Sequence, residues 1–152
     1  MIALACDHGG FELMSAIKIH LKSAGYEYKD FGTFSPDSCD YPVIAVPAAK
    51  AITDGICDKG IFICGTGIGM SIAANKIPGI RAALCTSRYM AEMTRSHNDS
   101  NVLVLGGRVI GPDSAVEIVD VFLCTVFSEN EKHCRRVAML NELDEERKGC
   151  VS

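Results

Sequence analysis

Five short segments rich in apolar residues alternate with longer amphipathic segments along the chain. Short apolar runs bounded by turn residues are typical of buried β-strands. The predicted strands cover residues 2–6, 26–31, 60–64, 80–85 and 101–105. In the remaining segments apolar residues recur every three to four positions, which predicts helices. The predicted helices cover residues 11–23, 41–53, 68–76, 87–96, 114–127 and 129–147.

Several residues predict where these helices begin, end or bend. Gly25 and Gly55 stand where the first two helices should stop, because glycine adopts the left-handed conformation that ends many helices. Pro47 predicts a kink or a short break inside the second helix, since it lacks a backbone N–H. Ser128 and Glu131 have the spacing of a capping box at the start of the last helix.

This order of elements predicts one α/β domain over residues 1–152, with helices on both faces of a five-stranded parallel sheet. Right-handed crossovers bring the loop after each strand to one edge of such a sheet, where ligands bind. We therefore look for candidate chemistry in the loops that follow the strands.

Composition and charge narrow the range of partners. Apolar residues make up 48% and charged residues 22% of the chain, which is typical of a globular protein. The net charge of −4 argues against nucleic acid or an anionic membrane as a partner. The first residues lack the basic region of a signal peptide, and no stretch reaches the roughly 20 apolar residues of a membrane span. We expect a cytoplasmic protein.

The cysteines do not form a recognisable metal or redox motif. There are eight of them and no Cys-x-x-Cys pair, so we expect neither a zinc site nor a thiol-redox site. Cys6, Cys64 and Cys85 end predicted strands, where a free cysteine behaves as a small apolar residue.

The most informative segment is the glycine-rich loop at residues 64–71, which reads Cys-Gly-Thr-Gly-Ile-Gly-Met-Ser and runs from the third strand into a helix. Its glycines let backbone N–H groups approach a ligand, and the helix N-terminus adds partial positive charge, so the loop suits an anion. A tight turn with nothing bound is the alternative. The spacing does not match a dinucleotide fingerprint or a Walker loop.

Three polar residues follow predicted strands at the same edge. A helix N-terminus stabilises a thiolate, so Cys64 is a candidate base near neutral pH, although a buried structural thiol is the alternative. Asp7 is a candidate acid or base whose ordinary alternative is to cap the first helix. His8 is a candidate phosphate ligand or proton relay.

Two more polar clusters lie in the second half of the chain. His97 and Asn98 close the fourth helix, and Arg108 follows the fifth strand. Lys132 and Arg136 lie one turn apart on the last helix, which suits either an anion or a solvated basic face.

Taken together, these motifs resemble the type B ribose-5-phosphate isomerases of the ribose/galactose isomerase family. The matching segments span most of the chain; they are 6–10, 40–42, 63–69, 71–76, 79–82, 97–99 and 107–109. The resemblance implies a Rossmann-like three-layer αβα sandwich with a five-stranded parallel sheet and a C-terminal helix. It also implies an aldose–ketose isomerase that needs neither cofactor nor metal and acts on a small sugar phosphate.

The resemblance assigns catalytic roles to individual residues. It implies that Cys64 is the base that moves a proton between C1 and C2 of the open sugar, through an enediolate. Some relatives use a glutamate just after the glycine loop, where this chain has Met70, so the proton transfer falls to Cys64. Thr66 resembles part of the hole for the enediolate oxygen, and His97, with Asp7 as a candidate partner, resembles the pair that opens the furanose ring.

The remaining roles implied by the resemblance concern binding. The substrate-binding residues are His8, Tyr41, Gly65, Gly67, Gly69, Ser71, Asn98, Arg108, Lys132, His133 and Arg136. Of these, His8, Arg108, His133 and Arg136 match the phosphate contacts. Lys132 departs from the family pattern, which has arginine there, and so loses the two-pronged grip on phosphate oxygens.

The family resemblance also implies at least a homodimer, or a tetramer. His97 precedes the fifth strand, whereas Cys64 and Asp7 end their strands, so His97 is expected at the opposite edge of the sheet. A site that uses both groups would then be shared between two subunits. Two other functions remain open at this point, namely a galactose-6-phosphate isomerase subunit and a non-catalytic module that senses a phosphate or nucleotide.

Overall fold

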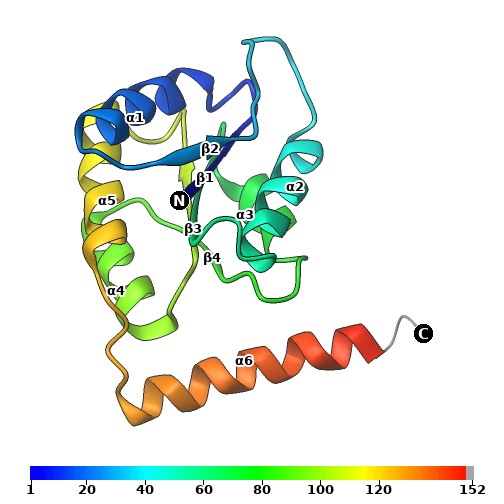
Figure 1. Ribbon diagram of the computed structural model, residues 1–152. Helices are drawn as coiled ribbons and strands as arrows, with labels where there is room; N and C mark the ends of the chain where they lie inside the picture. The colour runs from blue at the N-terminus through cyan, green and yellow to red at the C-terminus, as the bar shows by residue number, and fades with distance from the viewer. Residues whose placement is uncertain (150–152) are drawn as a thin grey trace.

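A five-stranded parallel sheet forms the centre of the computed structural model, which describes residues 1–149 (Figure 1). The strands lie in the order β2-β1-β3-β5-β4, and every pair of neighbours is parallel. Their bounds are β1 Ile2–Cys6, β2 Tyr28–Asp30, β3 Lys59–Cys64, β4 Ala82–Leu84 and β5 Val102–Gly106. The predicted parallel sheet is confirmed.

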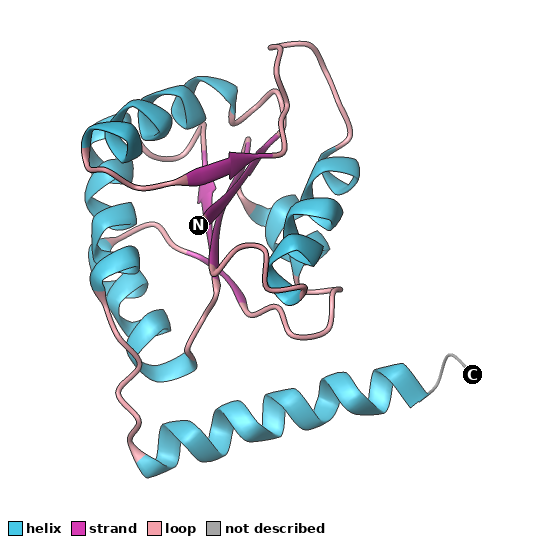
Figure 2. Cartoon of the chain, viewed as in Figure 1, coloured by secondary structure: helices cyan, strands magenta, loops and turns pink. Residues whose placement is uncertain are grey.

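Helices cover both faces of the sheet (Figure 2). Their bounds are α1 Phe11–Ser23, α2 Tyr41–Thr53, α3 Ile68–Ala74, α4 Arg88–Asn98, α5 Pro112–Cys124 and α6 Glu131–Gly149. On one face lie α1, α4 and α5, on the other lie α2 and α3, and α6 runs apart from both layers. This is the expected three-layer α/β fold with a C-terminal helix. None of the helices within residues 1–149 is long and apolar enough to cross a membrane.

The side chains of the central strands alternate between the two helical layers, as the pleat requires. In β3, Ile61 and Ile63 pack toward α1 and α5, whereas Phe62 and Cys64 pack toward α2 and α3. Cys64 therefore shares its side of the sheet with Met70, which is fully buried. The alternation fixes which layer each catalytic candidate faces.

The two edge strands are shorter than predicted. Both β2 and β4 contain three residues, although the sequence pattern extended them over 26–31 and 80–85. Each pairs with one neighbour only, β2 with β1 and β4 with β5. Only three residues of each edge strand pair with the neighbouring strand, so apolar character alone overestimates the length of an edge strand.

The helix ends confirm two predictions and correct one. Gly25 and Gly55 have φ of +78° and +73° and follow the last turns of α1 and α2. However, α2 continues through Pro47, so a break is absent, while a kink at this position stays a prediction. Pro47 lies on the exposed side of α2, opposite a row of fully buried alanines at 45, 48 and 49, and the packing of that row holds the helix together.

The predicted capping box at the start of α6 is wrong. The helix begins at Glu131, and its Lys132 N–H donates to Oδ1 of Asn130 at 3.2 Å, so Asn130 supplies the cap. Ser128 lies two residues earlier, and its hydroxyl group makes a different contact, with the ring of His133.

Candidate active site

The loops after β1, β3 and β5 interlock at the carboxyl edge of the sheet. The N–H groups of Gly107 and Arg108 donate to the carbonyl oxygens of Cys64 and Gly65, at 2.8 and 2.9 Å. A Cβ atom on Gly107 would lie 2.4 Å from the carbonyl oxygen of Gly9, so the loops touch where only glycine fits. This packing brings residues from three separate predicted motifs to one place.

Cys64 lies at the start of the glycine-rich loop, and its sulfur atom accepts a hydrogen bond from the backbone. The Gly67 N–H donates to Cys64 Sγ at 3.2 Å, and 4% of the Cys64 surface is exposed. Gly67 has φ of +80° at the N-terminus of α3, a conformation that favours glycine. Thr66 is exposed beside it, and its Oγ1 accepts the Ile68 N–H at 3.3 Å.

Other buried cysteines have apolar surroundings that oppose ionisation. Burial raises the pKa of Cys6 to about 12 and that of Cys85 to about 11, and it also raises the pKa of Cys57. The surroundings of these thiols suit the small apolar role that the sequence predicted for strand-end cysteines.

Tyr41 and Ser71 flank the glycine-rich loop. The Tyr41 ring, at the start of α2, packs so closely over Gly69 that a Cβ there would lie 2.7 Å from the ring. Ser71 lies in the first turn of α3 and is half-buried. Both predicted binding residues therefore lie next to the loop.

Asp7 shapes the loop after β1 instead of capping α1. Its Oδ1 accepts the N–H groups of Gly9 and Gly10 at 2.8 and 3.2 Å, and 6% of the residue is exposed. The N-cap of α1 is Gly10, whose N–H is one of these two donors. The carboxylate thus fixes the turn that presents His8.

His8 and Arg108 line one cavity of about 480 Å³ at the same edge. The Cys39 N–H donates to His8 Nδ1 at 3.3 Å, so the neutral ring carries its proton on Nε2 and can donate it to a ligand. The other lining residues are Gly9, Phe11, Glu12, Pro36 and Gly107. Two of the predicted phosphate contacts therefore meet in one hollow.

The remaining predicted residues gather where α4 ends and α6 begins. The rings of His97 and His133 lie 4.3 Å apart, and Asn98 ends α4 beside them. Lys132 and Arg136 are exposed on the first turns of α6, whereas 6% of His133 is exposed. The pKa of His133 is lowered, first by burial and then by the positive charges of its neighbours.

These two groups of residues lie at opposite ends of the sheet within one chain. Cys64 pairs with Gly106 at the end of β5, whereas α4 leads into the beginning of β5 at Val102 (Figure 1). A parallel strand rises about 3.3 Å per residue, so these two levels are roughly 13 Å apart. The chain therefore does not bring His97 next to Cys64, nor next to its candidate partner Asp7.

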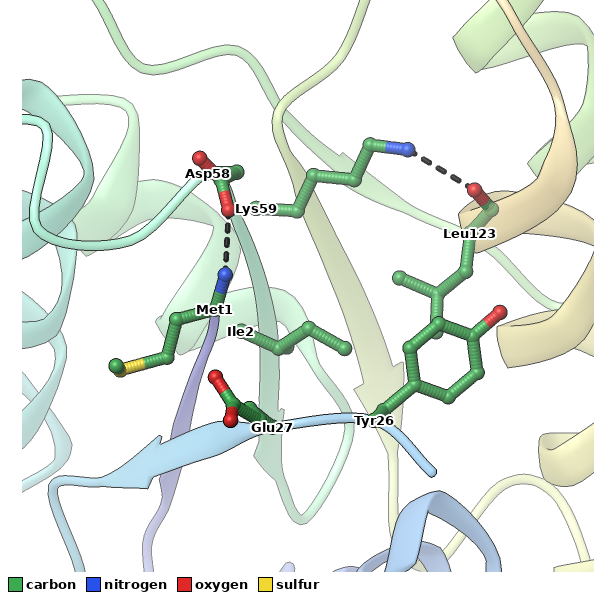
Figure 3. Close-up of a pocket in the computed structure, with 7 residues that line it drawn as sticks. All are labelled: Met1, Ile2, Tyr26, Glu27, Asp58, Lys59 and Leu123. Atoms are coloured by element: carbon green, nitrogen blue, oxygen red, sulfur yellow. Dashed lines mark hydrogen bonds and ion pairs between the residues drawn. The ribbon is translucent and has the colours of Figure 1, made fainter. Parts of the chain in front are cut away.

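Another cavity, of about 350 Å³, opens at the amino edge of the sheet (Figure 3). The Met1 ammonium group pairs with Asp58 there, and Lys59 Nζ donates to the Leu123 carbonyl oxygen at 3.0 Å. Burial lowers the pKa of Lys59. These contacts tie β1, β3 and α5 together, and none of the predicted site residues lines this cavity.

Two structural supports of the second group were missed by sequence reasoning. Arg81 and Arg95 both bind the Asp99 carboxylate, at 3.0 and 2.8 Å, directly after His97 and Asn98. Asp99 adopts the left-handed conformation that ends α4. Arg95 and Asp99 are four residues apart in the sequence, a spacing that is typical of ion pairs on a helix. The sequence alone could therefore have indicated the Arg95–Asp99 pair.

The fold and these loops define an α/β protein whose candidate ligand site lies at the carboxyl edge of a parallel sheet. A family model described as ribose/galactose isomerase matches residues 2–140. Ribose-5-phosphate isomerase B of Escherichia coli strain K12 is 46% identical over 146 residues, covering 96% of this chain and 97% of that protein. A 4-deoxy-4-sulfo-D-erythrose isomerase of a Clostridium species is 40% identical, covering 89% and 86%.

Solved structures agree with this match. That of ribose-5-phosphate isomerase B from Clostridium thermocellum has a TM-score of 0.93 and 50% sequence identity, covering 96% of this chain and 98% of that chain. That of the type B enzyme from Trypanosoma brucei has a TM-score of 0.90 and 43% identity, covering 93% and 97%. The chain belongs to the ribose/galactose isomerase family and is an isomerase.

Proposed function

We propose that this enzyme interconverts ribose 5-phosphate and ribulose 5-phosphate, with Cys64 as the base. The observation that carries this proposal is the Gly67 N–H, which donates to Cys64 Sγ and stabilises negative charge on the sulfur. Met70, the position where some relatives have a glutamate, is buried and cannot accept a proton. The E. coli and C. thermocellum relatives, named ribose-5-phosphate isomerase B, support the choice of substrate.

The isomerisation moves one proton between two carbons without net oxidation. The Cys64 thiolate takes the proton from C2 of the open aldose, and negative charge develops on the carbonyl oxygen O1. Thr66 and the N–H groups of the loop from Gly65 to Gly69 stabilise this enediolate. Cys64 then returns the proton to C1, while O2 loses its hydroxyl proton and O1 gains one. The base ends as the thiolate it began as.

The phosphate and the furanose ring require further groups. His8 and Arg108 line a common cavity and would hold the phosphate together with the exposed Lys132 and Arg136. His97 would donate a proton to the ring oxygen as the O1 hydroxyl group loses one, for which Asp7 is the candidate acceptor. Tyr41, Ser71 and Asn98 would contact the sugar hydroxyl groups.

We place the enzyme in the cytoplasm as a homodimer. If each site takes residues from both subunits, Cys64 and His97 can act on the same sugar although they lie far apart in one chain. Cys64 and His97 lie at opposite ends of the sheet, so one chain cannot supply both to a single sugar. Large apolar side chains also lie exposed on α3, α4 and α6. They include Ile68, Ile72, Tyr89, Met139 and Leu143. Burying them against a second copy would stabilise such a dimer.

The test separates proton transfer from ring opening. Cys64→Ala should lower the turnover of ribose 5-phosphate by roughly 10²–10⁴-fold, the ordinary contribution of a general base. The same variant should still exchange the α and β anomers of ribose 5-phosphate, because His97 remains to open the ring. Anomer exchange is measured by NMR and turnover by formation of the ketose.

The matched control is Cys134→Ala, since Cys134 is an exposed thiol on α6. It should keep full activity. Retention of more than half the turnover by Cys64→Ala would contradict the base assignment. A parallel assay with galactose 6-phosphate tests the alternative substrate, and a higher kcat/KM for that sugar would replace ribose 5-phosphate in the proposal.

A further inference from the structure

The hydroxyl group of Ser128 contacts a histidine ring instead of capping α6. Ser128 Oγ lies 2.7 Å from His133 Nδ1 and accepts the Asn130 N–H at 3.3 Å. The Ser128 N–H in turn donates to the Ser96 carbonyl oxygen at 3.0 Å, in the last turns of α4. Ser128 is therefore tied by backbone contacts to α4 on one side and to the residue before α6 on the other.

These contacts favour one protonation state of His133. Because the Ser128 oxygen already accepts the Asn130 N–H, its own proton is free to donate to His133 Nδ1. A ring that accepts at Nδ1 is neutral and carries its proton on Nε2. A Ser128 hydroxyl group that donates to Nδ1 would therefore favour the neutral ring with its proton on Nε2.

The rings of His133 and His97 lie so close together that a positive charge on one would repel a positive charge on the other. Their ring centroids lie 4.3 Å apart with an angle of 37° between the planes. From α6, Lys132 and Arg136 add positive charge, and His97 faces the ring from α4. With 6% of His133 exposed, little water reaches the ring to offset these charges. A proton added to His133 would therefore place its charge against His97, Lys132 and Arg136.

We propose that Ser128 and His133 are positioning residues for His97: the Ser128 hydroxyl group holds His133 neutral, with its proton on Nε2, so that His97 is the ring that carries the acidic proton. This inference rests on the proposed role of His97 in opening the sugar ring. It gives His133 a role in addition to the phosphate contact implied by the family resemblance.

The direct test is ¹⁵N NMR of the histidine rings in the substrate-free enzyme, which does not depend on catalysis. The chain has four histidines, so single His→Gln variants assign the signals. Wild-type His133 should show a protonated Nε2 and a bare Nδ1 at neutral pH. Ser128→Ala should move the ring toward a mixture of tautomers and make it about five-fold easier to protonate, the ordinary worth of one hydrogen bond.

The functional test uses anomer exchange of ribose 5-phosphate in the Cys64→Ala background, where proton transfer between carbons is blocked. Adding Ser128→Ala should slow anomer exchange by up to about five-fold, because the proton shifts from His97 to His133 by at most the factor by which His133 becomes easier to protonate. Ser128→Thr keeps the hydroxyl group and should restore both the NMR signals and the exchange rate. Ser23→Ala is the matched control, because the exposed Ser23 hydroxyl group bonds a carbonyl oxygen of α1 far from this pair.

The outcomes separate this inference from the proposed function. Unchanged His133 signals in Ser128→Ala would overturn the inference, whatever the activity. Changed signals with an unchanged rate of anomer exchange would also overturn it, because the pair would then be uncoupled from ring opening. If Cys64→Ala alone does not speed anomer exchange above the spontaneous rate of the free sugar, the role of His97 in the proposed function fails, and the NMR result still decides what Ser128 does to His133.

Discussion

Buried thiols in this chain differ in what surrounds their sulfur atoms. Cys64 has the Gly67 N–H directed at its sulfur, whereas Cys85 packs among apolar side chains that raise its pKa to about 11. The ordinary value is 9.0. An unfolded chain therefore releases the Cys85 proton near pH 9.0, while the folded chain retains it until about pH 11.

This difference predicts a loss of folding stability at alkaline pH. The unfolded state binds fewer protons than the folded state above pH 9.0, so the free energy of unfolding should fall from there up to about pH 11. Urea unfolding of Cys85→Ala across this range should show a shallower decline than the wild type. Cys134→Ala, at an exposed position, should follow the wild-type slope, and equal slopes in all three proteins would refute the assignment.

At the scale of elements, two ion pairs hold the end of α4 in place, one within the helix and one to the segment before β4. Asp99 lies in the left-handed region with φ of 46°, and its carboxylate binds Arg95 on α4 and Arg81 just before β4. Arg95 is buried, with 8% of the residue exposed. This clamp determines where the last turn of α4 presents His97.

Asp99→Asn should weaken the clamp while keeping a residue that tolerates the left-handed conformation. We expect a loss of about 1.5–3 kcal/mol in the free energy of unfolding, the usual contribution of hydrogen bonds to charged groups. Urea unfolding gives this value, and anomer exchange of ribose 5-phosphate should slow because His97 is displaced. Glu92→Gln, an exposed position on the same helix, is the control and should change neither quantity. Wild-type stability in Asp99→Asn would show that the two arginines hold the helix end without it.

The period of apolar residues in the sequence predicted the bounds of elements that bury one regular face. It failed where strand pairing or helix capping depends on residues that are distant in the sequence. The bounds of α1 and α2 agree with prediction because one continuous face of each helix is buried. The edge strand β4 is shorter than its apolar run, since only Ala82–Leu84 pair with β5, and an apolar run does not show where pairing with another strand stops. The start of α6 was misassigned because the Ser128 hydroxyl group contacts His133, and a spacing rule between neighbours does not detect that competition.

At the scale of the whole molecule, the candidate site was predictable in part. Parallel topology brings the loops after β1, β3 and β5 to one edge, and the structure interlocks them there. The same topology places His97 at the other end, as expected from its position before β5. The pairing of His97 with His133 was not predictable, because it depends on how α6 returns to α4.

Mixing two inactive variants tests the shared site. In a dimer of Cys64→Ala with His97→Ala, one of the two sites keeps both groups, so random exchange should restore up to about a quarter of wild-type activity. Turnover of ribose 5-phosphate after dissociation and reassembly measures this. Cys64→Ala mixed with His8→Ala is the control, because both residues lie at the same edge and no intact site can form. Equal activity in both mixtures would contradict the divided site.

The separation of Cys64 and His97 along the sheet also has a consequence for how activity depends on dilution. If each site needs two chains, a single chain has no working site, however well it is folded. Activity per milligram should then decline as the enzyme is diluted below the dissociation constant of its dimer, and saturating substrate should oppose the decline because it binds both chains at once. For this fold, the concentration of the enzyme in a cell would determine the fraction of chains that are assembled into active dimers, as well as the total number of active sites.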